Sequence, residues 1–276
     1  MNISEHIAKF TQEMKRRNYA KNTIDNYVSC LQVFLSKINK DHPKNINEHD
    51  IKEFLSKYST VNTQRNYHGA IKKFYEICLN QKYKFKNIPY ARTEKKLPIV
   101  LSKSEIQRMF DVCDNLKHKV ILSILYACGL RVSELINLKW CHIDRSRMII
   151  NIIGAKGNKD RQVMLPESLI PLLIKYYLAY KSKEYVLNGQ SGIQYTDRSV
   201  LQVVKQLADK AGIHKRVYTH LMRHCSFTHM CEGGTDINII QKLAGHNNVK
   251  TTMIYTHMSH NIISNVNSPL NSINLG

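Results

Sequence analysis

Long apolar runs are missing from this chain of 276 residues. No segment approaches the roughly 20 apolar residues that a bilayer-spanning helix needs, and the start, MNISEHIAKF, lacks the basic-then-apolar pattern of a secretory signal. Hydrophobic residues make up 43% of the chain, enough for real cores. The sequence therefore predicts a protein of the cytoplasm with no membrane partner.

Paired cysteines are also missing. The number of cysteines is odd, they are scattered, and no Cys-x-x-Cys occurs, which disfavours a disulfide framework and indicates reduced, mostly buried thiols. The acidic residues form no cluster that would hold two Mg²⁺ ions, and the glycines of GAKGNK lack the spacing of a Walker loop. We therefore expect no ATP site, no paired-metal site and no cofactor. The seven cysteines are Cys30, Cys78, Cys113, Cys128, Cys141, Cys225 and Cys231.

A dense run of histidine and cysteine between positions 220 and 231 raises the question of zinc. His220 and His224 are four residues apart, as in a helical metal pair. However, the glutamate of a His-Glu-x-x-His motif is missing, and Arg223 would place a positive charge beside the ion. The pattern disfavours a metal site here.

Acidic residues are scarce: 21 stand against 41 lysines and arginines, for a net charge of +20. Residues 1–97 carry 19 basic and 9 acidic side chains, and residues 98–276 carry the other 22 and 12. A basic tail would concentrate the charge at one end. Two equally basic halves instead suit two domains that grip one polyanion between them. Charge alone also fits a basic protein with no such partner, but nucleic acid is the favoured one.

The chain reads as two domains joined by a linker. Residues 1–88 show apolar positions at helical spacing, and two of the helices are expected at about 48–58 and 62–79, with Asn22 or Thr23 as the cap of another. Residues 89–98 are basic, contain two prolines and lack a helical stripe, which is typical of a linker. In residues 99–276 a capping box, Ser102 with Glu105, opens a mostly helical domain, and MIINII and RQVMLP flank a turn that predicts a β-hairpin. The fold class is mainly α with a small β-sheet (α+β).

The segment TTMIYTH places Tyr255 where it could act as a nucleophile. A phenol has a pKa near 10 and attacks weakly when neutral. Attack on a phosphodiester would need arginines to fork the phosphate oxygens and a lysine or histidine to protonate the leaving oxygen. The chain contains such residues: Arg131 in CGLRVSELINL, Lys156 at the hairpin tip, His220 and Arg223 in THLMRHCSFTH, and His246 nine residues before Tyr255.

Each of these residues has an ordinary structural role when it is taken alone. Arg131 could be an arginine at a helix start that pairs with Glu134, and we expect Glu134 to pair with a neighbour in any case. Lys156 could be a solvated turn lysine, His246 a cap, and Tyr255 a core aromatic. The order and the spacing of the set favour the chemical interpretation.

These segments resemble the tyrosine recombinases, also called the phage-integrase family, and most of all the bacterial Xer and integron-type members. The resemblance covers nearly the whole chain, and AKNTIDNYVSCLQVFL is similar to the family's helical core-binding domain. The hairpin departs from the family pattern by one extra residue before the lysine, so Lys156 and Lys159 both stay open as the acid. Met222 and Phe227 also depart from the usual residues, and Phe227, where a small residue is usual, predicts altered local packing.

The resemblance implies a site-specific DNA recombinase of the nucleoid, with a core-binding domain at 1–88, a linker at 89–98 and a catalytic domain with a tail at 99–276. Tyr255 would attack DNA to form a 3′-phosphotyrosyl bond, Arg131 and Arg223 would clamp the phosphate, Lys156 would protonate the leaving oxygen, His220 would be the base and His246 a phosphate donor. It also implies a Holliday junction and a homotetramer that holds two double-stranded DNA sites. The apolar stripe Ile262, Ile263, Val266 and Leu270 predicts a tail that docks on a neighbouring protomer or on its own domain. A topoisomerase-like strand transferase and a non-catalytic architectural DNA-binding protein are the alternatives.

Overall fold

The computed structural model describes residues 2–92, 99–155, 159–189 and 194–258. It divides the chain into two compact units, Met1–Lys95 and Lys96–Gly276. The division falls within the segment 89–98. The domain limits inferred from the sequence remain a prediction. Lys156 and the tail stripe from Ile262 onward lie outside the described residues.

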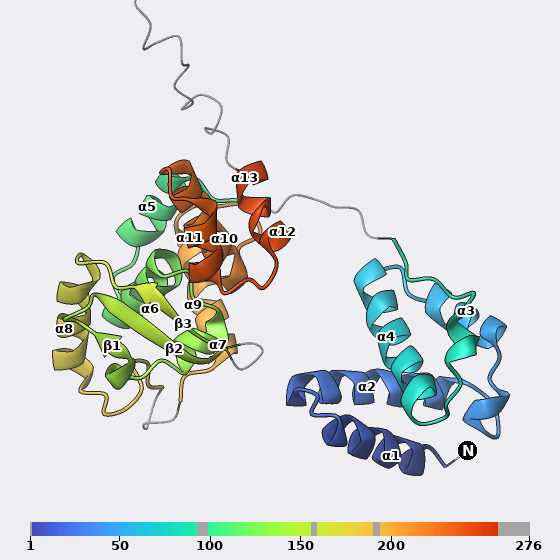
Figure 1. Cartoon of the computed structure of the whole chain (residues 1–276). Helices are drawn as coiled ribbons and strands as arrows, with labels where there is room; N and C mark the ends of the chain where they lie inside the picture. Colours follow the sequence, from blue (N-terminus) through green and yellow to red (C-terminus); the bar gives the residue numbers. More distant parts are fainter. Residues whose placement is uncertain (1, 93–98, 156–158, 190–193, 259–276) are drawn as a thin grey trace, which may run out of the picture. The chain divides into compact units, whose positions relative to one another are not determined.

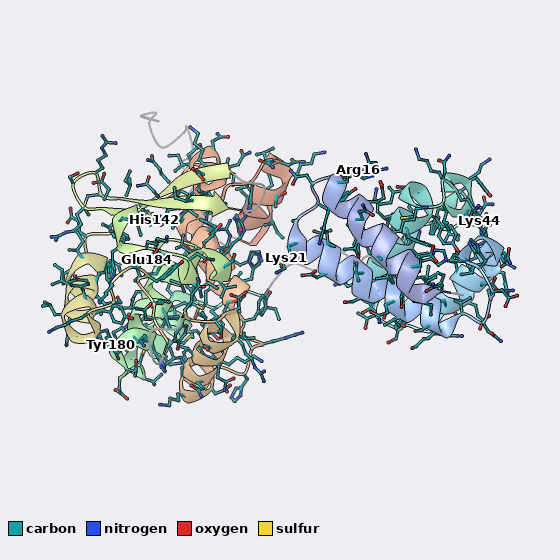
Figure 2. All side chains as sticks on the ribbon, turned by 90° about the horizontal axis from the view of Figure 1, so that it is seen from below. Arg16, Lys21, Lys44, His142, Tyr180 and Glu184 are labelled. Carbon is teal, nitrogen blue, oxygen red and sulfur yellow. The ribbon has the colours of Figure 1, made fainter. Side chains whose placement is uncertain are left out.

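The N-terminal unit is a small helical bundle (Figure 1). In it α1 packs against α2, and α2 packs against α4. Aromatic side chains fill the core, where Phe34 and Phe54 meet edge to face at 4.9 Å and Phe10 meets Phe74 at 5.8 Å. Basic side chains such as Arg16 and Lys44 stand at its surface (Figure 2). The elements are α1 (Ile3–Arg16), α2 (Lys21–Lys37), η1 (Pro43–Asn45), α3 (Glu48–Ser56), α4 (Val61–Ile77) and η2 (Lys82–Phe85).

The expected cap of α2 is wrong. The helix begins at Lys21 with Ala20 as its N-cap, and no side chain caps it. The carbonyl of Ala20 accepts from the amides of Thr23 and Ile24. This places Thr23 inside the first turn and lets Ile24 enter the core. Burial of Ile24 therefore sets the start of the helix, since a side-chain cap adds only about 1 kcal/mol.

The second unit is built on the apolar helix α6, against which α10 and α8 pack. The predicted capping box at Ser102 and Glu105 is confirmed at the start of α5. Among the described residues, no helix is both long and apolar enough to span a membrane. The helices of this unit are α5 (Lys103–Asp111), α6 (Leu116–Ala127), α7 (Val132–Ile136), η3 (Trp140–His142), α8 (Leu169–Tyr180), α9 (Asp197–Lys210), α10 (Thr219–Glu232), α11 (Ile237–Ala244), α12 (Val249–Thr252) and α13 (Ile254–Met258).

One antiparallel sheet, of order β1-β2-β3, lies in the second unit. The strands are β1 (Ile143–Asp144), β2 (Ile149–Ala155) and β3 (Lys159–Met164). The predicted hairpin is thus confirmed as β2 and β3, whereas β1, only two residues long, was not predicted because so short a strand has no readable alternation. The expected class, mainly α with a small sheet, is confirmed.

Candidate active site

A left-handed glycine places the first arginine. Gly129 has φ +58° and lies between α6 and α7, and a Cβ there would lie 2.6 Å from the ring of Phe227, so only glycine fits. Two residues later Arg131 is the N-cap of α7, and its amide donates to Glu134 Oε2 at 2.8 Å. Its guanidinium donates to Glu134 Oε1 at 2.7 Å. The expected pairing of Glu134 with a neighbour is confirmed.

The second arginine is fully buried. Arg223, on α10, donates from one terminal nitrogen to the carbonyl of Gly129 at 2.5 Å and from the other to the carbonyl of Ala244. Arg131 donates to the same Ala244 carbonyl at 3.4 Å. Burial, and then the charge of Arg131, lowers the pKa of Arg223 to about 10, so the side chain stays charged at neutral pH. The two guanidiniums converge on one point, and Nε of Arg223 has no hydrogen-bond partner among the described residues.

The candidate nucleophile lies beside this pair of arginines. Tyr255, on α13, is 1% exposed and is packed in a cluster with Phe227, Ile240 and Ala244. Its ring stacks on that of His246, with centroids 6.2 Å apart and planes inclined by 15°. Burial raises the pKa of Tyr255, while the charges of Arg223 and Arg131 act in the opposite direction. The phenol is therefore neutral at rest and needs a base in order to react.

Two histidines, His224 and His246, lie near the ring of the tyrosine, and a third, His220, lies against His224. His246 follows Gly245, whose φ is +61°, and its Nδ1 lies 3.0 Å from the hydroxyl of Thr252. His220, in the first turn of α10, is only partly exposed, and its ring meets that of His224 at 4.6 Å. Partial burial and the neighbouring arginines lower the pKa of His220. His224, for which the sequence suggested no role in the chemistry, lies 5.8 Å from the Tyr255 ring between centroids.

The neutral histidines make stability depend on pH. Burial, and then neighbouring charges, holds the pKa of His224 and of His246 at about 4, against about 6.5 in an unfolded chain. Between these values the unfolded chain binds more protons, so the free energy of unfolding should fall as the pH drops from about 6.5 to 4. Urea unfolding of the DNA-free protein, followed by the fluorescence of Trp140, checks this. Replacing His224 or His246 by glutamine should flatten the dependence, whereas replacing the exposed His214 should not; an equal slope in all variants would contradict the assignment.

Glu134 joins the arginine pair to the sheet. Arg161, on β3, donates to both of its carboxylate oxygens, at 2.6 and 2.7 Å, and donates from Nε to the carbonyl of Leu243 at 2.8 Å. Burial would raise the pKa of Glu134, but the bonds from Arg161 and Arg131 outweigh it and hold the pKa at about 2. The motifs in the sequence predict no role for Arg161. The signal that could have identified Arg161 is the alternation of side chains along the strand. Arg161 and the buried Val163 lie on one face of β3, and an arginine whose side chain is buried needs partners for its charge.

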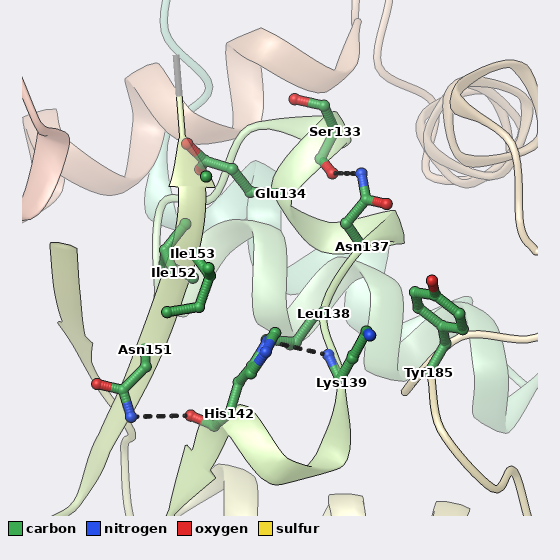
Figure 3. A pocket seen from close by; sticks show the side chains of 11 residues that line it. Ser133, Glu134, Asn137, Leu138, Lys139, His142, Asn151, Ile152, Ile153 and Tyr185 are labelled. Carbon is green, nitrogen blue, oxygen red and sulfur yellow. Dashed lines mark hydrogen bonds between the residues drawn. The ribbon is translucent and has the colours of Figure 1, made fainter. Parts of the chain in front are cut away.

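Two pockets meet at this network. One, of about 770 Å³, is lined by Arg131, Arg161, Lys242, His246 and polar neighbours. The other, of about 350 Å³, is lined by residues 133–134, residues 137–139 and His142, by residues 151–154 of β2 and by Tyr185, and it includes Glu134 (Figure 3). There Asn137 donates to the carbonyl of Ser133 at 2.7 Å, and Asn151 to that of His142 at 3.4 Å. The first pocket is the basic one, open to an anion beside Arg131 and His246.

The structure thus brings together Arg131, Arg223, His220, His246 and Tyr255, while Lys156 lies outside the described residues. Phe227 also enters the site: its ring lies 4.8 Å from the Arg223 guanidinium and 5.4 Å from the Tyr255 ring, beneath Gly129. No group of three or more His, Cys, Asp or Glu residues that could hold a metal ion occurs in the part of the chain that the structure describes.

Two arginines that converge beside an enclosed tyrosine and neighbouring histidines are the groups that a phosphoryl-transfer site with a tyrosine nucleophile would need. The chain matches the model of the phage integrase family over residues 100–261 and that of the phage integrase N-terminal SAM-like domain over residues 7–85. It belongs to the phage integrase family, the tyrosine recombinases.

Curated relatives resemble the chain over most of its length. Tyrosine recombinase XerA of Pyrococcus horikoshii is 31% identical, over 93% of this chain and 90% of the relative. Tyrosine recombinase XerC of Bacillus pumilus is 30% identical, over 88% of each. A crystal structure of XerA recombinase is 29% identical in sequence and superposes with a TM-score of 0.57, over 95% of this chain and 96% of that chain. The fold is also that of a lambda integrase dimer bound to a core site. That structure superposes with a TM-score of 0.77 at 14% identity, over 91% of this chain and 97% of that chain.

Proposed function

We propose that this protein is a site-specific DNA recombinase that cuts and rejoins double-stranded DNA through Tyr255. The observation that supports it most is the convergence of Arg131 and Arg223 on the Ala244 carbonyl, with an unpartnered Nε on Arg223 and the Tyr255 phenol alongside. Forked arginines suit the two non-bridging oxygens of a phosphodiester. The even, strongly positive charge of the chain suits the DNA backbone.

In the proposed reaction, Tyr255 Oη forms a bond to phosphorus and the bond from phosphorus to the 5′ oxygen breaks. The phenol proton passes to His220, and the 5′ oxygen takes a proton from Lys156 and leaves as a hydroxyl. Arg131 and Arg223 stabilise the charge that builds on the phosphate in the transition state, and His246 donates a hydrogen bond to it. The 3′-phosphotyrosyl link keeps the energy of the broken bond, so rejoining to a new 5′ hydroxyl needs no cofactor.

Trapping the covalent adduct tests this function. DNA recovered from cells with the Tyr255→Phe protein and sequenced gives the site. In a duplex with a nick a few nucleotides beyond the cleavage position, the short fragment that carries the new 5′ hydroxyl then dissociates and the protein stays attached to the 3′ phosphate, which a denaturing gel resolves. We expect an adduct with the unaltered protein, also in EDTA, because the proposed chemistry uses only side chains. Site-specific binding without any adduct would favour an architectural protein, and relaxation of supercoiled DNA lacking the site would favour a topoisomerase.

The acid is tested by changing the leaving group. Lys156→Ala should slow cleavage of a normal 5′ oxygen by about 100-fold or more. A 5′-bridging sulfur needs no proton to leave, so cleavage of that substrate should be restored. Single-turnover rates on the two substrates check this, with Lys159→Ala as the matched variant. If the sulfur substrate restores cleavage by Lys159→Ala and not by Lys156→Ala, Lys159 is the acid.

Assembly belongs to the same proposal: four protomers would hold two DNA sites in the nucleoid, pass through a Holliday junction and exchange C-terminal tails. The support is the apolar stripe of the tail sequence, Ile262, Ile263, Val266 and Leu270, which must be buried somewhere. Deleting residues from Ile262 onward should leave binding to one site nearly unchanged and weaken two-site complexes. Gel shifts with one and two sites measure both. Unchanged two-site complexes would mean that the tail packs on its own domain.

A further inference from the structure

Arg161 occupies a special position on the hairpin. The pairing of β2 with β3 is regular from Ile149 opposite Met164 to Ile152 opposite Arg161, and the register then shifts before Ala155 meets Lys159. Arg161 is thus the last regularly paired residue of β3 before the tip. Beyond it, the amide of Gly154 donates to the carboxylate of Asp160 at 2.9 Å. Contacts that fix Arg161 therefore fix the end of the regular pairing between β2 and β3.

Three contacts fix the Arg161 side chain, which is 8% exposed. Its terminal nitrogens hold Glu134, the same carboxylate that holds Arg131. Its Nε holds the Leu243 carbonyl at the end of α11. Its Cδ lies under Gly245, where a Cβ would approach it to 2.9 Å. One planar, five-donor side chain thus ties the hairpin to the first turn of α7 and to the turn before His246.

The contacts on either side of Arg161 belong to the proposed machinery. Glu134 orients Arg131, Ala244 receives both catalytic arginines, and His246 follows Gly245 directly. Lys159, one of the two candidate acids, is the first residue of β3, and Lys156, the other, lies in the sequence between β2 and β3. A small displacement of the hairpin relative to the arginines would carry the acid away from the leaving oxygen, and misplacement by about 1 Å can cost roughly 100-fold in rate.

We propose that Arg161 is a positioning residue that holds the lysine-bearing hairpin in register with the arginine clamp, so that protonation of the leaving oxygen coincides with attack by Tyr255. Arg161 itself touches no reacting atom. The inference rests on the proposed function. It adds a residue that positions the lysine acid and does not itself bind the phosphate. Arg131 keeps its own hydrogen bonds to Glu134, from its amide and from its guanidinium. Loss of the Arg161 side chain therefore leaves Arg131 bound to Glu134 but removes the contacts that hold the hairpin in place.

A purely structural role for Arg161 makes a different prediction. A buried ion pair that loses one partner destabilises the fold, because the other charge is left without its compensation. Such damage would lower every activity of the site alike. A lost hairpin anchor instead harms the step that needs the acid and spares a substrate that does not.

The test is the pair of leaving groups, 5′ oxygen and 5′ sulfur, on nicked duplexes under single-turnover conditions. Arg161→Gln should slow the oxygen substrate by about 100-fold and the sulfur substrate by less than about tenfold. Arg161→Lys keeps a charge for Glu134 but cannot fork it and reach Leu243 at once, so it should show the same selectivity. Arg147→Gln is the matched control, since Arg147 lies in the same sheet's first turn with its side chain 77% exposed, and it should change neither rate.

Equal losses on both substrates in Arg161→Gln and Arg161→Lys would overturn the inference and leave Arg161 a structural residue. Thermal unfolding shows whether Arg161→Gln folds. If it does not, the inference is tested with Arg161→Lys alone, by comparing its rate losses on the oxygen and sulfur substrates. Failure of the proposed function looks different, because the unaltered protein would then form no adduct with either substrate.

Discussion

Replacing Tyr255 by phenylalanine is expected to abolish the covalent protein–DNA adduct and to leave DNA binding intact. The substitution removes one oxygen and keeps the ring that packs against Phe227 and His246. The fold should therefore survive, while the atom that forms the bond to phosphorus is gone. A nicked substrate on a denaturing gel measures the adduct, and a native gel shift measures binding.

Tyr126→Phe is the matched control for Tyr255→Phe. It also removes a partly buried hydroxyl from the second unit, one that lies 2.9 Å from Nδ1 of His229 and that the proposed reaction does not use. The control should form the adduct at nearly the normal rate. An adduct that persisted in Tyr255→Phe would move the nucleophile to another residue and remove the central element of the proposed function.

Replacing Arg223 by alanine is expected to reduce cleavage by several orders of magnitude. A single contact to the charge of a transition state is worth about 3 kcal/mol, or roughly 100-fold to 1000-fold in rate. Arg223 is also fully buried and holds the carbonyls of Gly129 and Ala244, so its loss leaves both without this donor. Part of the effect will therefore be a lower free energy of unfolding.

Arg223→Lys separates the two effects, because lysine keeps a charge but cannot donate as a planar fork to two carbonyls and a phosphate. Single-turnover cleavage and urea unfolding are measured for both variants, with the exposed Arg216→Ala as the control for lost charge. Cleavage by Arg223→Lys should stay at least about 100-fold below normal. Near-normal cleavage by either variant would show that Arg223 serves the fold and not the phosphate.

The helices and the hairpin could be predicted from the sequence because each is marked locally. Ser102 and Glu105 form a box three residues apart, and MIINII and RQVMLP bracket a polar turn. The start of α2 could not be predicted, because burial of Ile24 outweighed the capping preference of Asn22 and Thr23. Local rules fail where a core contact opposes them.

The candidate site residues are predicted from residue types and spacings, whereas the contacts between them depend on long-range packing. The Ala244 carbonyl that receives Arg131 and Arg223 has no side-chain signal, and it lies 113 and 21 residues from them. The altered packing expected at Phe227 became specific only with the fold, which sets its ring beneath Gly129 and beside Arg223. Arg161 was missed for the same reason, since its partners come from α7 and α11.

The enclosure of Tyr255 bears on the safety of the genome in which such an enzyme works. A cell's DNA offers an immense excess of ordinary phosphodiesters, and a freely accessible phenol beside two arginines would break strands at random. With only 1% of Tyr255 exposed, a phosphate resting on the protein surface cannot touch its hydroxyl. If Tyr255 is the nucleophile, as we propose, strand breakage would first require the segment that carries it to move, and the resting protein could lie on chromosomal DNA without cutting it.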